Sequence, residues 1–484
     1  MQQTTSSVAP ATTPAKIRLG VERRCIDYVP HSERHGKIWH LGAIWFSGST
    51  QIATLAVGAI GVAMGANLLW TAIAAVLGTA FGTFFMAFHS TQGPQLGLPQ
   101  MIQSRPQFGY MGALLVWVVA LVTYVGYNAF NQVLAGDTIH NLIHIDPKHG
   151  LLAFTVLSLA VAFLGHDWIH KAQQWIAVSM TIVLIIFAVG VGFSVKFDAS
   201  QFSLSEFHGV PFFIQFFAAA AYQLSWAIYV SDYSRYMPAN VGVRASFWWT
   251  YLGAFIGGAS MMLVGAAAAT FHAKADISAA VQLLGDSIYP GFGVLTLVLS
   301  LAALVTMASL NFYGASLTLL SIADSFKPAR SSVRARLISL LIVAVAATLI
   351  ALDASGDFLA KFGDFLGVLL YLFTPWTAIN LVDFYLVRKT EYSVREIFNP
   401  RGMYGRWNWR GLSAYFIGFA AMIPFSSNGF YIGPFAKLIG NIDIGMVIGL
   451  VVSAGVYFWV CRSLDTQTER VLARQADVGL DVDR

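Results

Sequence analysis

Long apolar stretches follow one another along almost the whole chain, separated by short polar segments. About 20 consecutive apolar residues are enough to cross a bilayer as a helix. The pattern therefore predicts an all-α polytopic membrane protein with twelve transmembrane helices. The predicted spans cover residues 38–64, 68–90, 108–135, 149–166, 171–194, 211–232, 246–271, 291–323, 337–353, 358–387, 411–430 and 441–463.

Two of these spans carry polar interruptions at corresponding places. In the first span, residues 47–51 (SGSTQ) separate two apolar runs, and in the sixth span residues 222–225 (YQLS) precede Trp226. Small polar residues also let helices pack closely, so one such stretch alone has an ordinary structural explanation. Non-helical backbone at membrane depth, however, is tolerated only where it lines a cavity or is buried in protein. Broken helices in both halves of a chain indicate the midplane binding site of a secondary transporter.

The distribution of basic residues supports the count of twelve and predicts the orientation. With the N-terminus in the cytoplasm, all but five of the 29 Lys and Arg residues fall in cytoplasmic segments, as the positive-inside rule requires. The five exceptions are Lys148, Lys196, Lys274, Lys361 and Lys437. Residues 1–37 and 464–484 are then cytoplasmic tails on a transporter domain that covers residues 38–463.

Composition excludes several other classes of protein. The chain is 57% hydrophobic and 11% charged, whereas a soluble surface needs more charge. The net charge of +5 follows from the membrane topology, so nucleic acid is not an expected partner. Cys25 and Cys461 form no disulfide or metal-binding pattern, and no Walker-type phosphate loop is present. We expect no catalytic residues and no cofactor, and neither an enzyme nor a channel.

Acidic residues avoid the middles of the spans. Asp232, Asp324, Asp364 and Asp383 all fall near predicted helix ends, where a solvated position is expected. Uncharged polar and aromatic side chains lie at depth instead; they are Gln51, Tyr124, Tyr127, Asn128, Asn131, Gln223, Trp226, Thr306 and Asn311. Amides offer a donor beside an acceptor, and aromatic faces stack on flat rings. This inventory favours a neutral, planar, hydrogen-bonding ligand, although a lone amide often only joins two helices.

At these residues the chain resembles the nucleobase–cation symporter-1 family, which contains purine, cytosine, allantoin and hydantoin permeases. The resemblance rests on residues 44–51, 92–105, 124–128, 225–235, 311–317 and 382–388, which follow the family's order. It implies a LeuT-like bundle of two inverted five-helix repeats with two further helices at the C-terminal end. The repeats would cover 38–194 and 211–387, and helices 11 and 12 would cover 411–463.

The same resemblance implies a set of substrate-binding residues. It assigns contacts with the substrate to Gln51, Tyr124, Asn128 and Asn311, with the Tyr124 ring stacked on the ligand. In span 6, the hydantoin carriers place their stacking tryptophan at Gln223, whereas the purine and cytosine permeases place it at Trp226. We take Trp226 as the stacking ring and Gln223 as a further contact, and which of the two faces the ring stays open.

The coupling ion is also left open by the sequence. Sodium-dependent members of the family bind the ion between the first-helix break and two adjacent hydroxyl residues of span 8. Here carbonyls of Ser47 and Thr50 and the hydroxyl of Thr306 are available, but Val305 replaces the second hydroxyl. Na⁺ prefers more oxygen ligands than these three groups supply. Either Na⁺ or H⁺ is therefore compatible with the sequence.

The resemblance implies a function as well as a fold. We expect import of a nucleobase-type heterocycle, cytosine and/or purines, by symport with Na⁺ or H⁺ through alternating access. The alternative is a permease of the same family for allantoin, hydantoin, uracil or a vitamin ring. The expected location is the inner or plasma membrane, with the lipid bilayer, the heterocycle and the coupling cation as partners.

Overall fold

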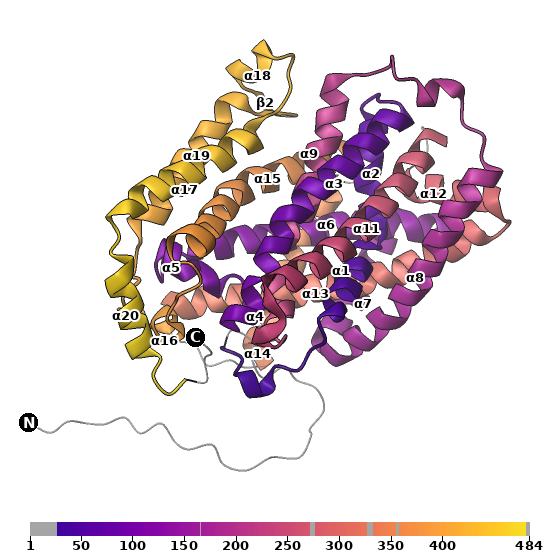
Figure 1. Ribbon diagram of the computed structural model, residues 1–484. Coiled ribbons are helices and arrows are strands. Elements are labelled where there is room, and N and C mark those ends of the chain that lie inside the picture. The colour runs from indigo at the N-terminus through magenta and orange to yellow at the C-terminus, as the bar shows by residue number, and fades with distance from the viewer. Residues whose placement is uncertain (1–26, 165, 272–275, 327–332, 355–357, 481–484) are drawn as a thin grey trace, which may run out of the picture.

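All twelve predicted spans fall on helices in the structure (Figure 1). The structure is a computed structural model that describes residues 27–480 apart from 165, 272–275, 327–332 and 355–357. Ten spans correspond to single helices: α3 (Leu68–Ser90), α6 (Leu114–Ile143), α7 (Pro147–Leu164), α8 (His166–Ser194), α11 (Gly242–Phe271), α13 (Phe292–Phe326), α14 (Val333–Ala354), α15 (Phe358–Val382), α17 (Trp409–Met422) and α19 (Gly445–Val460).

Length and hydropathy of the helices alone identify fewer than twelve spans. Within the described residues, seven helices are long and apolar enough to cross a membrane, and a bent pair of helices adds an eighth. Among the other predicted spans, the one at 411–430 coincides with α17, which has only 14 residues. The fold is all-α and multi-spanning, as the hydropathy pattern predicts.

The first predicted break is present at the expected residues. Helix α1 (Trp39–Ser49) ends two residues before α2 (Ile52–Ala63) begins, and the two axes differ by 60°. Gln51 is fully extended, with φ −145° and ψ 162°. The Thr50 hydroxyl donates to the Ser47 carbonyl at 2.9 Å. Side chains that bond to nearby carbonyls give the backbone an alternative to the helical ladder, which explains why the helix stops here.

The second break lies about one turn later than the sequence pattern predicts. Helix α9 (Gly209–Ser225) continues through the polar residues 222–225, and a 3₁₀ turn, η4 (Trp226–Ile228), follows it. Tyr229 then leaves the helical region, with φ −136° and ψ 9°. The Ser225 hydroxyl bonds to the carbonyl of Tyr222 at 2.7 Å, so it is satisfied without unwinding the helix.

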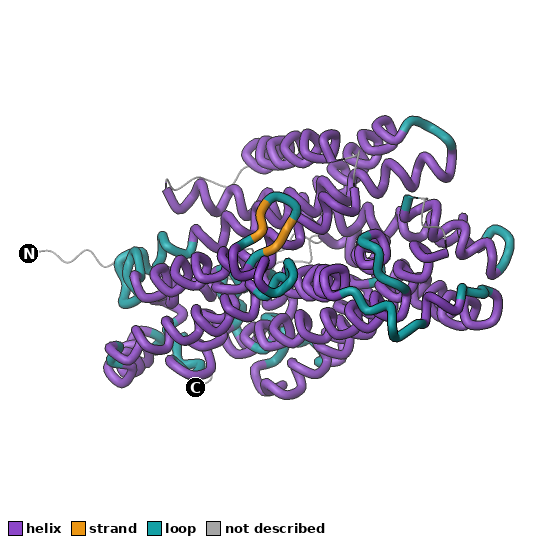
Figure 2. The backbone as a smooth tube through the Cα atoms, turned by 90° about the horizontal axis from the view of Figure 1, so that it is seen from above, coloured by secondary structure: helices purple, strands orange, loops and turns teal. Residues whose placement is uncertain are grey.

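Shorter elements connect the spans. The helices among them are α4 (Gln92–Leu96), α5 (Arg105–Phe108), α10 (Val230–Ser234), α12 (Ile277–Ile288), α16 (Val394–Phe398), α18 (Pro434–Leu438) and α20 (Thr466–Ala476), together with short turns η1 (His31–Glu33), η2 (Ile102–Ser104), η3 (Ala199–Phe202), η5 (Ala239–Val241), η6 (Asp383–Val387), η7 (Ile423–Phe425) and η8 (Cys461–Ser463). Strands β1 (Ser427–Asn428) and β2 (Tyr431–Ile432) form the antiparallel hairpin drawn in orange in Figure 2. Helix α12 is not predicted from the sequence, and α20 lies in the segment predicted to be a tail.

Glycines allow the helices around the two breaks to approach closely. A Cβ atom at Gly78 or Gly82 of α3 would collide with backbone carbonyls of α9, and one at Gly58 of α2 would collide with the backbone of α11. Membrane helices use small residues in this way, because packing replaces the hydrophobic driving force available in water. These contacts fix α2, α3, α9 and α11 as one packed unit around the first break.

Asp383 is buried rather than solvated, which differs from the expectation for a helix end. It lies where α15 passes into the π-helical turn η6, and its side chain is fully buried. Arg388 Nη1 contacts its Oδ1 at 2.6 Å, and Gln107 Nε2 donates to its Oδ2 at 2.6 Å. Hydroxyls of Tyr392 and Tyr457 donate to the same carboxylate at 2.9 and 3.0 Å. Four partners therefore replace the water that the carboxylate loses.

The same network holds the C-terminal helix against the bundle. Arg388 Nε contacts Glu469 Oε1 of α20 at 2.8 Å, and this arginine is 4% exposed. Farther along α20, Arg474 reaches Glu391 at 3.2 Å in an exposed ion pair. Figure 1 shows α20 running beside α16, on the flank that α17 and α19 form. Asp383, Arg388 and Glu469 thus form a chain of buried charges from α15 to α20.

We predict that Asp383→Ala lowers the free energy of unfolding by about 3–5 kcal/mol, because Arg388 loses one of its two buried carboxylate partners. The measurement is thermal unfolding of the purified protein in detergent. Glu391→Gln is the matched control: it breaks the exposed pair with Arg474, which contributes about 0–1 kcal/mol. Equal shifts for the two variants would contradict the buried network.

Candidate functional site

The two breaks meet through Gln51 and Tyr222. Gln51 Nε2 donates to the Gly48 carbonyl at 3.2 Å and to the Tyr222 hydroxyl at 3.1 Å. The same hydroxyl lies 2.8 Å from Thr54 Oγ1 at the start of α2. Gln51 Oε1 is buried and has no hydrogen-bond partner among the described residues. One acceptor of the predicted substrate glutamine is therefore uncommitted at the point where spans 1 and 6 touch.

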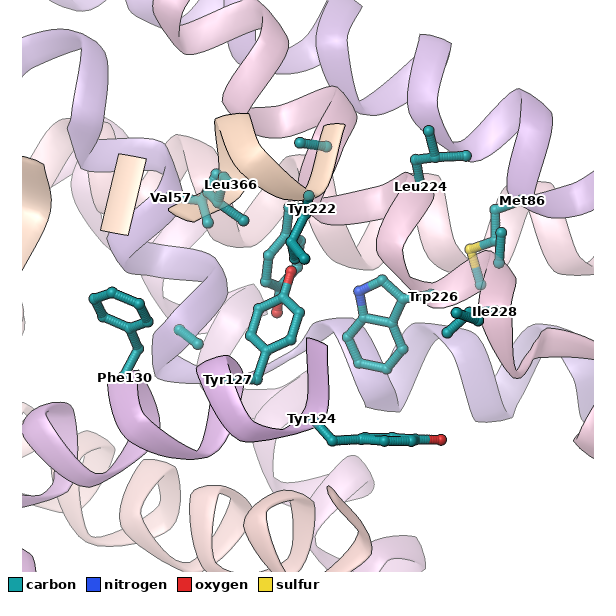
Figure 3. Packing of buried hydrophobic residues seen from close by; sticks show 14 of the residues in the cluster. Val57, Met86, Tyr124, Tyr127, Phe130, Tyr222, Leu224, Trp226, Ile228 and Leu366 are labelled. Atoms are coloured by element: carbon teal, nitrogen blue, oxygen red, sulfur yellow. The ribbon is translucent and has the colours of Figure 1, made fainter. Parts of the chain in front are cut away.

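Trp226 lies at the second break and packs directly on the first. A Cβ atom at Gly48 would lie 3.2 Å from the Trp226 ring, so the glycine allows this approach. The ring meets Trp45 edge to face, with centroids 5.7 Å apart. Trp226 Nε1 is buried, and no acceptor for it exists in the part of the chain that the structure describes. Figure 3 shows this indole beside Tyr222 and Tyr127.

Tyr124 and Asn128 lie one turn apart on α6 and face the same cluster. The Tyr124 ring stacks on Tyr229, with centroids 5.6 Å apart and an angle of 19° between the rings. Tyr229 in turn lies 5.9 Å from Trp226, tilted by 58°. Tyr229 is thus the ring neighbour that Tyr124 and Trp226 share.

Asn128 carries the most informative polar group of the cluster. Its side chain is 0% exposed, and neither the amide nitrogen nor the amide oxygen has a partner among the described residues. A buried unsatisfied group costs about 1–3 kcal/mol, and most buried polar atoms are satisfied for that reason. Asn128 is therefore a position where stability is reduced and where a ligand with a donor and an acceptor would restore it.

Gly314 brings α13 to the same cluster. A Cβ atom at Gly314 would lie 2.8 Å from Cζ of Tyr124, so the helix packs tightly against that ring. Asn311 precedes Gly314 by about one turn and is 9% exposed. Spans 1, 3, 6 and 8 thus all contribute predicted site residues to one region.

Gln223 is directed toward α11. Its Nε2 donates to the Ala254 carbonyl at 3.3 Å and lies against Gly258. Its Oε1 is buried without a partner in the described chain. The Trp226 ring packs in the aromatic cluster, whereas the Gln223 side chain is bonded to α11.

The candidate cation ligands are oxygens that already take part in local hydrogen bonds. The Ser47 carbonyl accepts from the backbone N–H and the hydroxyl of Thr50, at 3.2 and 2.9 Å. The Thr306 hydroxyl donates to the Ala303 carbonyl at 2.8 Å and keeps its lone pairs. Carbonyl and hydroxyl oxygens suit a hard cation such as Na⁺. Within the described residues, no group of three His, Cys, Asp or Glu side chains is placed to hold a metal ion.

The sequence analysis missed three members of the cluster, Tyr222, Tyr229 and Thr54. It counted Tyr127, whose hydroxyl lies 2.8 Å from Ser225 Oγ, among the side chains at depth but not among the substrate contacts. Tyr222 and Tyr229 flank Trp226 at spacings of four and three residues, which places them near it on a helix. That spacing was the available signal, but a helix break removes the periodicity on which it depends.

Comparison with known proteins agrees with this architecture. The all-α bundle, with two broken spans joined by Gln51 and Tyr222, has a LeuT-like fold. The structure superposes on Mhp1, a nucleobase-cation-symport-1 family transporter in a closed conformation with bromovinylhydantoin bound, with a TM-score of 0.72. The match covers 94% of this chain and 99% of the other at 17% identity, so it establishes the fold.

Sequence comparison identifies the family. Residues 28–449 match the profile of the family described as "Permease for cytosine/purines, uracil, thiamine, allantoin", and the chain belongs to this family. It is 37% identical over 443 residues to "Putative purine-cytosine permease YxlA" of Bacillus subtilis, covering 90% of this chain and 95% of that one. It is 26% identical to the purine-cytosine permease fcyB of Emericella nidulans, covering 92% and 90%. The protein is thus a multi-pass membrane permease, and its relatives are transporters, not enzymes.

We predict that Asn128→Leu leaves stability unchanged or raises it, while ligand binding weakens about tenfold or more through two lost hydrogen bonds. Melting temperature and equilibrium binding, measured on the same preparation, separate the two effects. Gln215→Leu is the matched control, because Gln215 is equally buried but bonds Gly61 N at 2.7 Å and the Val57 carbonyl at 3.1 Å. The control should lose about 1–3 kcal/mol of stability. A comparable loss for Asn128→Leu would contradict the assignment.

Proposed function

We propose that the protein imports a nucleobase-type heterocycle, cytosine and/or purines, by symport with Na⁺ or H⁺. The observation that carries the proposal is the set of buried polar groups that have no partner among the described residues and lie beside aromatic faces where the two broken spans meet. The family description and the names of the relatives support this substrate class. Allantoin, hydantoin, uracil or a vitamin ring is the alternative cargo within the same family.

In this proposal, aromatic side chains contact the faces of the substrate ring, and polar side chains bond to its edges. Trp226 and Tyr124 supply the faces, and Tyr229 must move from the Tyr124 ring to admit the substrate. Asn128, Asn311 and Gln51 bond the polar edges, with Gln223 as a further contact after it leaves the Ala254 carbonyl. A planar amide-containing ring has donors and acceptors in its own plane, so this division matches its chemistry.

Coupling would follow from the position of the first break. A cation held by the Ser47 and Thr50 carbonyls and the Thr306 hydroxyl would join span 1 to span 8. Such a contact favours one arrangement of the two repeats over the other, and alternating access follows when the repeats rock about the site. The two repeats, 38–194 and 211–387, are the bodies that we propose to move. The excess of Lys and Arg in the proposed cytoplasmic segments supports an inner or plasma membrane orientation with both termini in the cytoplasm.

The test of this function is uptake of labelled cytosine by cells that lack their own permeases. We expect accumulation that unlabelled nucleobases inhibit and that is lost either without sodium or with an uncoupler. Loss without sodium identifies Na⁺ as the coupling ion, and loss with the uncoupler alone identifies H⁺. Accumulation of allantoin, a hydantoin or a vitamin ring, but not of cytosine, would replace the proposed cargo with the alternative. No uptake of any of these rings would contradict the proposal.

Stacking by Trp226 makes a separate prediction. Trp226→Phe keeps a ring face and should retain partial uptake, whereas Trp226→Ala should lose most of it, because one aromatic pair contributes about 0.5–1.5 kcal/mol beyond its buried area. Uptake is normalised to the amount of protein in the membrane. Equal activity of the two variants would show that the ring face is not used.

A further inference from the structure

A cavity of about 60 Å³ adjoins the aromatic cluster on the side of Tyr124. Tyr124 lines it, whereas Trp226 and Asn128 do not. Its walls come from the segment after α4, from α6, from α10 and from α13. It is therefore a space separate from the predicted binding site, with Tyr124 as the shared wall.

The cavity runs from Tyr124 toward one end of the bundle. Trp117 and Tyr124 both line it and are seven residues apart on α6, which corresponds to about 10 Å along the helix. On α13 the lining extends over a similar length, from Gly314 to Ser321. From Tyr124 to Trp117 on α6, and from Gly314 to Ser321 on α13, the lining runs toward the same end of the bundle. The loop between α3 and α6 lies at this end, which we propose faces the cytoplasm. The cavity thus lies on the route that a substrate would take from the central site to the cytoplasm.

The walls of the cavity carry the groups that a planar heterocycle needs. Trp117 supplies an aromatic face, and its buried Nε1 has no acceptor among the described residues. Asp232 supplies a carboxylate, whose Oδ1 accepts the backbone N–H of Gln100 at 2.8 Å. A hydrogen bond to a charged acceptor is about twice as strong as a neutral one. An indole, a carboxylate and the Tyr124 ring therefore line one small space.

The size of the cavity shows that it is closed to a ring in this conformation. A cavity that binds benzene has a volume of about 150 Å³, so 60 Å³ holds water but not a heterocycle. Tyr124 is fixed between Tyr229, which stacks on it, and Gly314, which lies against its Cζ. Tyr229 is the single residue between η4 and α10, and its φ of −136° lies outside the helical region. Rotation of this ring pair would join the cavity to the central site.

We propose that this cavity is a release subsite for the transported heterocycle, in which the Asp232 carboxylate accepts a ring N–H and Trp117 Nε1 donates to a ring acceptor. The inference rests on the proposed function and adds a second binding position on the cytoplasmic side of the first. The Tyr124–Tyr229 ring pair separates the two positions. Substrate leaves the central site when the pair opens and pauses against Asp232 before it enters the cytoplasm.

Asp232→Asn tests the carboxylate without removing the local bond to Gln100, because the asparagine oxygen still accepts that N–H. We expect net uptake to slow about tenfold, the effect of one charge-assisted hydrogen bond, while the affinity of the purified protein for substrate stays within about twofold. Asp364→Asn is the matched control, since Asp364 also accepts one backbone N–H, from Gly429 at 2.9 Å, but lies on α15 away from the cavity. It should change neither quantity. Slower uptake together with equally weakened binding would place Asp232 in the central site instead.

A second variant tests the same subsite without changing Asp232, so the result does not depend on whether Asp232→Asn folds normally. Trp117→Phe retains one aromatic ring and removes the five-membered ring with its N–H, so it should slow net uptake in the same way with unchanged affinity. Ser321→Cys, in a protein with Cys25 and Cys461 replaced by Ser, should react with a membrane-impermeant thiol reagent from the cytoplasmic side, and saturating substrate should slow that reaction. Wild-type uptake rates for Asp232→Asn and Trp117→Phe, with no protection of the cysteine, would overturn the release subsite. The proposed function fails separately, if the wild-type protein transports none of the rings.

Discussion

The requirement that buried backbone groups keep hydrogen-bond partners shapes the centre of this protein. Lipid supplies no partners, so a helix can break at membrane depth only where protein surrounds the break. Here the Gln51 side chain donates to the Gly48 carbonyl of its own break and to the Tyr222 hydroxyl next to the second break, which Thr54 also reaches. The glycine contacts of α2, α3, α9 and α11 hold these segments close enough for the bonds to form. Without that packing, neither break would be stable.

A consequence of this arrangement is that some polar atoms are left unpaired. Asn128, in the middle of α6, is the clearest case, because neither of its amide atoms has a partner among the described residues. The periphery shows the opposite behaviour, because Asp383 has four partners and fixes α15 to α19 and, through Arg388, to α20. The Asp383 carboxylate is thus fully bonded in the scaffold, whereas the Asn128 amide beside the aromatic cluster has no partner among the described residues.

Much of the fold could be predicted from the sequence, because hydropathy reports directly on the length of a membrane span. The first break was predicted at the correct residues, since Ser47, Thr50 and Gln51 interrupt the apolar run chemically. The second break was placed a turn too early, because the Ser225 hydroxyl bonds to a carbonyl of its own helix and does not interrupt it.

The burial of Asp383 was wrongly expected to be low, since its partners Gln107 and Tyr457 are distant in sequence. Tyr229 was missed for the same reason: its stacking on Tyr124 depends on the three-dimensional path of span 6. The roles assigned to Gln51, Tyr124, Asn128, Gln223, Trp226 and Asn311 stay predictions.

The central claim is that the substrate ring lies between the two breaks, against Trp226 and the amide of Asn128. The most direct measurement is an experimental structure of the protein determined with saturating cytosine or a purine. The account predicts ring-shaped density within hydrogen-bond distance of Asn128, with Tyr229 displaced from the Tyr124 ring. Density elsewhere in the bundle, with Asn128 still unpartnered and the Tyr124–Tyr229 stack intact, would contradict it.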